Sequence, residues 1–236
     1  MVNPEIKQSF IPVGRYNRPG HANPCNYITI HDPGTYDKGA DAYRHSEYLK
    51  NPSTKESWHY TVDDREIYQH LPDSESAYHA GDGAGKGNRQ SIGIEICVNS
   101  DGNLYAAADR AALLTAYLME LHDIPIGNVV QHNYWSGKDC PHTVRSGVPC
   151  TWQEFLKKAE EYMKREITAE EAVEILYKAG VLSDKAYWLE ALNHIKNLDA
   201  LFLENGALRV IVLPALGGKL RSEERRVGKE CRSRWS

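Results

Sequence analysis

The sequence has no apolar run that approaches the roughly 20 residues a membrane-spanning helix needs. Its first residues, Met-Val-Asn-Pro-Glu-Ile-Lys, lack the apolar core of a secretory signal. We therefore expect a chain without a membrane span that is made in the cytoplasm. It would stay there until release and reach an extracellular target only afterwards.

Cysteine is scarce and scattered. The five residues are Cys25, Cys97, Cys140, Cys150 and Cys231. An odd number of widely separated cysteines gives no disulfide framework, and a reducing compartment favours free thiols or metal ligation. A disulfide between Cys140 and Cys150 is the main alternative use of Cys140.

An excess of positive charge is also absent from most of the chain. Residues 1–218 contain 21 Lys or Arg against 29 Asp or Glu. An acidic body argues against a nucleic-acid partner, because a basic surface is the usual footprint of such binding.

The last residues differ in character from the rest. Residues 219–236 contain seven Lys or Arg against three Asp or Glu and show no amphipathic period. They resemble translated vector or adaptor sequence, so we expect a non-native tail that contributes nothing to fold or function. A solvated basic terminus and a wall- or lipid-binding tail are the alternatives.

Strand and helix patterns alternate through residues 1–165. Apolar or β-branched runs predict strands over 27–31, 58–62, 67–71, 91–98 and 129–132. Helices are expected over 39–50, over 107–121 and from Thr151, where a capping box with Glu154 starts the last one. Strands interleaved with long helices predict an α/β domain with a central mixed β-sheet flanked by helices.

A smaller unit follows over residues 168–204. Capping residues at Thr168 and Ser183 predict two helices, and Leu198 to Leu203 is a candidate third. We expect a small all-α module. So few helical residues bury little surface alone, so the module would dock on the main domain, form a homodimer or present an aromatic face to a ligand. Tyr187 and Trp188 either belong to that face or form the core of the module.

Three side chains that zinc prefers stand at the ends of predicted elements. His31 closes the strand Tyr-Ile-Thr-Ile-His, and His132 and Cys140 flank a short Gly-containing loop. Two histidines and one cysteine are a known catalytic ligand set for one zinc ion, with the fourth position left for water. Singly, each histidine is more often a hydrogen-bonded structural residue and the cysteine a small buried one.

Two charged residues are candidates for the chemistry beside such an ion. Glu95 lies in the apolar strand Ser-Ile-Gly-Ile-Glu-Ile, where a carboxylate is costly to bury, so it is a candidate general base with a raised pKa. Strand alternation equally allows Glu95 to face solvent. Lys138 would place a cation beside a developing oxyanion, although a lone lysine in a loop is usually solvated.

Several motifs in one order resemble the zinc-dependent N-acetylmuramoyl-L-alanine amidases, which include phage lysozyme-amidases and peptidoglycan recognition proteins. The motifs are Tyr-Ile-Thr-Ile-His31, Ser57-Trp-His-Tyr-Thr-Val-Asp-Asp64, Tyr78-His-Ala-Gly-Asp-Gly83, Asn88-Arg-Gln-Ser-Ile-Gly-Ile-Glu-Ile96, Val130-Gln-His132 and Gly137-Lys-Asp-Cys-Pro141.

The resemblance implies that His31, His132 and Cys140 bind one Zn²⁺, that Glu95 activates water, and that Lys138 steadies the tetrahedral intermediate. It also implies the substrate, since the family cuts the amide between N-acetylmuramic acid and L-alanine of bacterial peptidoglycan. Nothing in the spacing or composition selects peptidoglycan independently.

Two positions depart from the commonest family pattern. Asp32-Pro33 follows His31 where many relatives have Asn-Thr, which puts the support of that ligand in doubt. Trp58 occupies a slot where some phage members have a catalytic tyrosine. We expect Trp58, His59 and His79 to form the cleft wall or contact substrate, with core packing and structural hydrogen bonding as the alternatives.

Together these features predict a phage or prophage endolysin with an amidase domain followed by a helical targeting module. A host autolysin or recycling amidase is a second hypothesis. A non-catalytic peptidoglycan-binding module is a third, and loss of the cysteine ligand would favour it.

Overall fold

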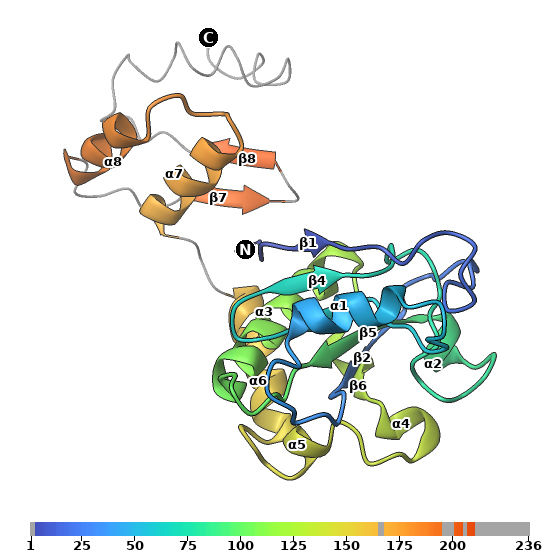
Figure 1. Ribbon diagram of the computed structural model, residues 1–236. Helices are drawn as coiled ribbons and strands as arrows, with labels where there is room; N and C mark the ends of the chain where they lie inside the picture. The colour runs from blue at the N-terminus through green and yellow to red at the C-terminus, as the bar shows by residue number, and fades with distance from the viewer. Residues whose placement is uncertain (1–2, 165–167, 195–200, 205–206, 211–236) are drawn as a thin grey trace. The chain divides into compact units, whose positions relative to one another are not determined.

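In the computed structural model a six-stranded mixed sheet has the order β1-β4-β3-β5-β2-β6 (Figure 1). The strands are β1 (Lys7–Gln8), β2 (Tyr27–His31), β3 (Tyr60–Val62), β4 (Ile67–Gln69), β5 (Ser91–Ile96) and β6 (Val129–Gln131). All neighbours pair in parallel except β3 and β4, which are antiparallel. The predicted mixed sheet is confirmed.

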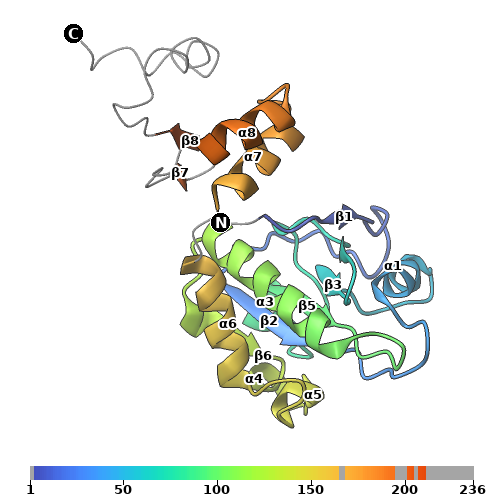
Figure 2. The same ribbon diagram turned by 90° about the vertical axis from the view of Figure 1, so that its left-hand side faces the viewer.

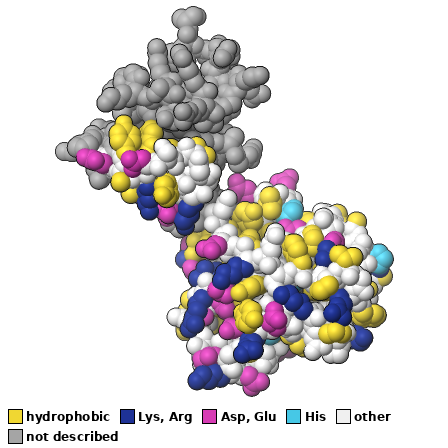
Figure 3. All heavy atoms as spheres, turned by 45° about the horizontal axis from the view of Figure 1, so that its top comes forward, with side chains coloured by type: hydrophobic (Ala, Val, Ile, Leu, Met, Phe, Trp, Pro, Cys, Tyr) yellow, Lys and Arg dark blue, Asp and Glu magenta, His cyan; other side chains and the backbone are white. Residues whose placement is uncertain are grey.

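The structure describes residues 3–164, 168–194, 201–204 and 207–210. The chain divides into two units, Met1–Arg165 and Glu166–Ser236. Among the described residues, no helix combines the length and apolar character that crossing a membrane requires. On the face shown in Figure 3, acidic and basic side chains are interspersed over the first unit.

The helices of the first unit follow in chain order. They are α1 (Ala42–Lys50), α2 (Lys86–Arg89), α3 (Leu104–Leu121), the short 3-10 helix η1 (Ile126–Asn128), α4 (Asn133–Ser136), α5 (His142–Arg145) and α6 (Trp152–Lys164). The glycine-rich segment over residues 80–89 ends in the short helix α2.

Alternation along the central strands separates an apolar face from a polar one. Ile28, Ile30, Ile92, Ile94 and Ile96 belong to one buried cluster that also contains residues of α3 and α6. These two helices lie side by side over that face (Figure 2). The apolar face supplies most of the burial that stabilises the unit.

The other face of the same strands is polar. Register places Thr29 opposite Gly93 and His31 opposite Glu95, so all four side-chain positions share this face. A second buried cluster, which includes Leu49 of α1 and Trp58, lies on this side. Because β2, β5 and β6 run in parallel, their carboxyl ends meet at one edge of the sheet.

The second unit contains α7 (Ala169–Lys178) and α8 (Lys185–His194). The predicted capping box is present, since Thr168 and Glu171 bond each other's backbone N–H groups. For α8 the side chain of Asp184 accepts from Tyr187 N, where Ser183 was expected to cap.

The all-α prediction for this module is wrong at its end. Residues Leu201–Glu204 (β7) and Ala207–Val210 (β8) pair as antiparallel strands where a third helix over Leu198 to Leu203 was expected. In the sequence Asn-Gly separates these two apolar runs, and this dipeptide strongly favours a hairpin. The hairpin preference outweighs the helix preference of the leucines. Residues 198–200 and the predicted non-native tail lie outside the described residues.

A charged pair joins the end of α3 to the segment after β4. His122 Nε2 donates to Asp73 Oδ2 at 2.8 Å, and Tyr60 and Gln69 donate to the other oxygen. The bond to Asp73 is the largest cause that raises the pKa of His122 to about 9. Burial acts to raise the pKa of Asp73, but the bonds from His122 and Tyr60 lower it overall.

We expect this pair to stabilise the fold at neutral pH and to contribute less at high pH. The folded pKa of His122 lies above its ordinary value of 6.5, so its contribution is fully present below pH 6.5 and is lost as the pH rises through 9. His122→Gln should therefore lower the free energy of unfolding by about 1–2 kcal/mol at pH 6, allowing for solvent screening, and by less at pH 10. Urea unfolding measures this, and equal losses at both pH values would contradict it.

Candidate metal centre and active site

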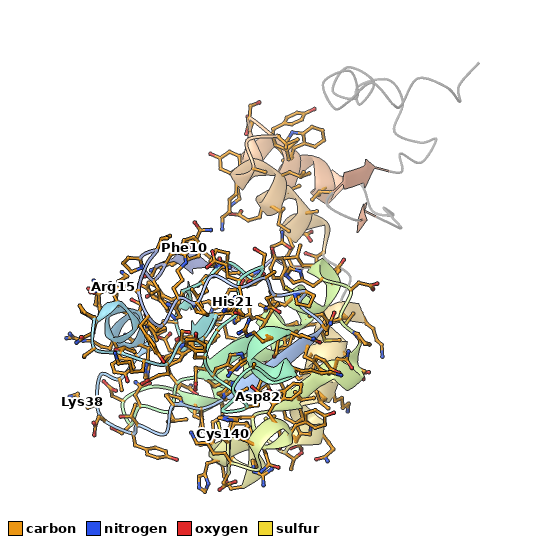
Figure 4. The ribbon with its side chains drawn as sticks, turned by 90° about the vertical axis from the view of Figure 1, so that its right-hand side faces the viewer. Phe10, Arg15, His21, Lys38, Asp82 and Cys140 are labelled. Carbon is orange, nitrogen blue, oxygen red and sulfur yellow. The ribbon has the colours of Figure 1, made fainter. Side chains whose placement is uncertain are left out.

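Three potential metal ligands meet at the carboxyl edge of the sheet. His31 is the last residue of β2, His132 directly follows β6, and Cys140 lies beyond the short helix α4. One ligand atom from each lies within 4.8 Å of the other two, and all three residues are buried. Figure 4 labels Cys140 beyond the ends of the strands. The structure thus brings together the three residues that the sequence suggested.

The donor atoms have spacings that suit a tetrahedral ion. His31 Nδ1 and His132 Nδ1 are 3.0 Å apart, and Cys140 Sγ is 3.7 Å from His31 Nδ1. Tetrahedral zinc with ordinary bond lengths separates two nitrogens by about 3.3 Å and a nitrogen from a sulfur by about 3.6 Å. The cluster can therefore hold one metal ion with little rearrangement.

Each of the two histidines has a further hydrogen-bond partner besides the other histidine. His31 Nε2 bonds to His79 Nδ1 at 2.9 Å, and His132 hydrogen-bonds to the backbone of Ala80. Burial is the largest cause that lowers the pKa of His31 and of His132, so both rings are neutral at pH 7. Neutral imidazole with its second nitrogen held by a partner is the form that ligates metals.

Hydrogen bonds hold the loop that carries Cys140 against the sheet. Asn133 N donates to the Cys140 carbonyl at 3.0 Å. Asp32 Oδ2 accepts from both the backbone N and the hydroxyl of Thr143, at 2.9 and 2.8 Å. The aspartate that departs from the commonest family pattern therefore ties the end of β2 to the segment following Cys140.

The Cys140 thiol is free, as is that of Cys150, so the alternative disulfide between them is not formed. Burial, aided by the charge of Glu95, raises the pKa of the Cys140 thiol to about 12. Without a cation the sulfur keeps its proton. A metal ion would displace that proton on binding, which makes metal affinity rise with pH.

Glu95 lies beside the cluster, on the strand position paired with His31. Its side chain is 8% exposed, and within the part of the chain that the structure describes Oε2 has no hydrogen-bond partner. Burial is the main cause that raises the pKa of Glu95 to about 8, and Lys138 opposes the shift. The alternative that Glu95 points to bulk solvent is excluded.

An open cleft of about 550 Å³ leads to this cluster. Both Glu95 and Lys138 line it, as does Trp58, whose indole N–H donates to Thr61 Oγ1 at 2.7 Å. Residues of α1 and nearby loops that the sequence did not single out form the rest of the wall. They include Arg44, His45, Tyr48, Glu56 and Tyr78.

The other two predicted cleft histidines have different surroundings. His79 lines the cleft and holds the Nε2 side of His31, so it positions a ligand besides facing the cleft. His59 is 0% exposed, with Nδ1 accepting from Gly93 N and Nε2 bonding to the Glu75 carbonyl. Because both its nitrogens serve the backbone, His59 is a structural residue, and its expected contact with substrate is corrected.

Comparison with known proteins places these features in a family. The family model described as N-acetylmuramoyl-L-alanine amidase matches residues 21–143. N-acetylmuramoyl-L-alanine amidase XlyA of Bacillus subtilis (strain 168) is 55% identical over 155 residues, which is 66% of this chain and 50% of that protein.

Two solved structures are similar over the first unit. The structure of the catalytic domain of XlyA is 52% identical, with a TM-score of 0.64, and the match covers 66% of this chain and 99% of that one. A mutant endolysin from Bacillus subtilis is 53% identical, with a TM-score of 0.63, over 67% of this chain and 99% of that one. The chain spans about half the length of the curated relatives it matches.

Gly93 in β5 leaves room for the His79 ring, which bonds to His31. A Cβ added to Gly93 would lie 2.9 Å from Cγ of His79, closer than real contacts allow. We expect Gly93→Ala to displace the His79 ring, loosen His31 and cost about 1–3 kcal/mol of folding stability, as overpacking usually does. Metal affinity should fall about tenfold or more, the usual effect of losing such support.

Titration with a divalent ion, together with urea unfolding, measures both effects. Gly127→Ala is the matched control, because a Cβ there meets nothing within 4 Å. If Gly93→Ala bound the metal as tightly as the control, His79 would not be a support for His31.

Proposed function

The chain belongs to the N-acetylmuramoyl-L-alanine amidase family, and from this premise we propose that it hydrolyses the amide between N-acetylmuramic acid and L-alanine of peptidoglycan. The single observation that carries the proposal is the cluster of His31, His132 and Cys140 beside a buried carboxylate in an open cleft. A family member that only binds peptidoglycan has no need of that complete set.

We assign His31 Nδ1, His132 Nδ1 and Cys140 Sγ as the ligands of one zinc ion. The spacing of the donor atoms and the neutral state of both rings support this choice over a harder cation, which prefers oxygen ligands. When bound, zinc would act as a Lewis acid toward the amide carbonyl and would acidify water in the fourth position.

Glu95 is the proposed general base. Its carboxylate faces the cleft without a hydrogen-bond partner among the described residues, so it is free to accept a proton from the attacking water. The same carboxyl can then protonate the departing amine of L-alanine. A pKa raised by burial makes that return of the proton easier than for an ordinary glutamate.

Lys138 is the proposed source of positive charge beside the reacting carbonyl. It lines the cleft two residues before Cys140, and its charge contributes to lowering the pKa of both His31 and His132, which supports this role. A fixed cation there would stabilise the oxyanion of the tetrahedral intermediate.

Trp58 and His79 line the cleft and are the remaining candidates for substrate contact. The indole N–H of Trp58 is satisfied by Thr61 and its ring belongs to the buried cluster with Leu49, so only the small part of the ring that lines the cleft is available to a substrate. We propose no such role for His59.

The biological setting we favour is that of a phage or prophage endolysin, supported by the similarity to an endolysin from Bacillus subtilis. The module over residues 168–204 would then target the catalytic unit to the wall or pair two copies of the chain. A host autolysin or a recycling amidase is the alternative, although a recycling enzyme would not require a targeting module.

Digestion of purified peptidoglycan tests the activity. We expect free stem peptides that begin at L-alanine, no cleavage within the glycan, and loss of activity with a chelator that added zinc restores. Mass analysis of the released fragments identifies the bond. Cleavage between sugars or between stem residues would reject the proposed reaction, and full activity in the chelator would reject the metal.

Glu95→Gln tests the base separately from the metal. Removing a general base costs about 10²–10⁴-fold in kcat, so we expect a loss of that size with zinc content unchanged. Glu66→Gln is the matched control, since Glu66 pairs with Lys7 outside the cleft. Metal analysis and wall digestion on both variants decide the outcome, and a Glu95→Gln enzyme within tenfold of the parent would exclude the role.

A further inference from the structure

Asn88 of α2 is a buried side chain that bonds to the segment beside the metal ligands. It is 4% exposed, although asparagine is usually found at the surface. Its Oδ1 accepts from the backbone N–H groups of His79 and Ala80, at 2.8 Å each. Its Nδ2 donates to the Gly83 carbonyl at 2.9 Å. One amide group therefore fixes two neighbouring backbone positions.

His79 and Ala80 are also the residues that the two histidine ligands contact. His79 Nδ1 bonds to His31 Nε2 at 2.9 Å. His132 hydrogen-bonds to the backbone of Ala80, and a Cβ added to Gly81 would lie 3.6 Å from His132 Nε2. The Nε2 sides of both ligands thus face this one segment of the chain.

Further bonds fix Asn88 in its own position. Its backbone N donates to Asp82 Oδ1 at 3.1 Å, and Gly87 N donates to the other oxygen of that carboxylate at 2.7 Å (Asp82 is labelled in Figure 4). The Asn88 carbonyl accepts from Ala77 N at 3.2 Å. A Cβ added to Gly87 would lie 2.4 Å from the Cβ of Ala80, so α2 packs closely against the same segment. These contacts fix the backbone from which the Asn88 side chain projects.

The position of His79 and Ala80 decides which nitrogen each ligand can offer to a metal ion. A histidine whose second nitrogen donates its proton to a fixed acceptor is oriented for ligation through the first. When a metal ion takes both Nδ1 atoms, both rings carry their protons on Nε2. The acceptors are then His79 Nδ1 and the Ala80 carbonyl, so a displacement of this segment would disturb both ligands at once.

We propose that Asn88 is a positioning residue for both histidine ligands, acting through the backbone of His79 and Ala80. The inference rests on the ligand set assigned in the proposed function. Asn88 itself does not line the cleft, so its effect reaches the metal ion only through the two groups that it holds.

Titration of the full chain with Zn²⁺ alone, in competition with a chromogenic chelator, tests the proposal without any substrate. Asn88→Ala removes the acceptor that the two N–H groups share. We expect the dissociation constant for Zn²⁺ to rise about tenfold or more, the usual effect of losing a group that orients metal ligands. With Co²⁺ in place of zinc, the visible absorption bands should also change, because they depend on the coordination geometry.

Asn17→Ala is the matched control. Asn17 is 1% exposed, and its Nδ2 donates to the carbonyls of Leu49 and Glu56, at 2.9 and 3.2 Å. Both variants lose buried hydrogen bonds to backbone, so urea unfolding should show a loss of stability in each. Only Asn88→Ala should weaken zinc binding, since these bonds of Asn17 reach neither His79 nor Ala80.

Equal zinc affinity in folded Asn88→Ala and Asn17→Ala would exclude the positioning role and leave the ligand set intact. A parent protein that binds no zinc would instead remove the ligand set, and the proposed function with it.

Amide hydrogen exchange of the parent protein decides if Asn88→Ala does not fold. Coupling is reciprocal, so zinc must strengthen the bonds of Asn88 if those bonds strengthen zinc binding. The N–H groups of His79 and Ala80 should therefore exchange more slowly with zinc than without, by a larger factor than the N–H groups of α3. An equal factor for both sets would overturn the proposal.

Discussion

Two imidazole nitrogens that lie 3.0 Å apart are the constraint on which the site depends. Each ring is neutral, and each has its other nitrogen committed elsewhere, His31 to His79 and His132 to the backbone of Ala80. A single proton between the two nitrogens makes one ring the donor and the other the acceptor, whereas a metal ion would accept a lone pair from each ring.

Strand register brings the side chains of His31 and His132 together at this edge of the sheet. Parallel pairing of β2 with β5 sets His31 opposite Glu95, and pairing with β6 places His132 at the same edge. A slip of one residue in β2 would turn His31 toward α3 and α6 and bring Ile30 into the cleft. The apolar face of the sheet, filled by isoleucines, makes such a slip expensive, so the core and the site specify each other.

The sequence was sufficient to predict the candidate metal ligands and the strands of the sheet, because both follow from short-range patterns. Alternation located β2, and the residue types at strand ends located His31, His132 and Cys140. It was insufficient for His59 and His79, because the side chain a histidine meets depends on strands distant in sequence. Gly93, a glycine inside an apolar strand, was the available sign that another group approaches closely. The hairpin after α8 was missed although Asn-Gly marked it.

The opposite ends of β2 illustrate how the surroundings of a histidine decide its charge. At the carboxyl end Cys140 lies among neutral rings and near a carboxylate, so its sulfur holds a proton until a metal ion replaces it. At the amino end His122 lies beside the Asp73 carboxylate, whose hydrogen bond raises its pKa to about 9 and keeps that ring protonated at neutral pH. Burial is the largest cause that lowers the pKa of His31 and His132, whereas for His122 the bond to Asp73 outweighs burial. A buried ring without a carboxylate partner therefore stays neutral and can offer a lone pair to a metal ion, whereas a ring held by a carboxylate becomes a cation.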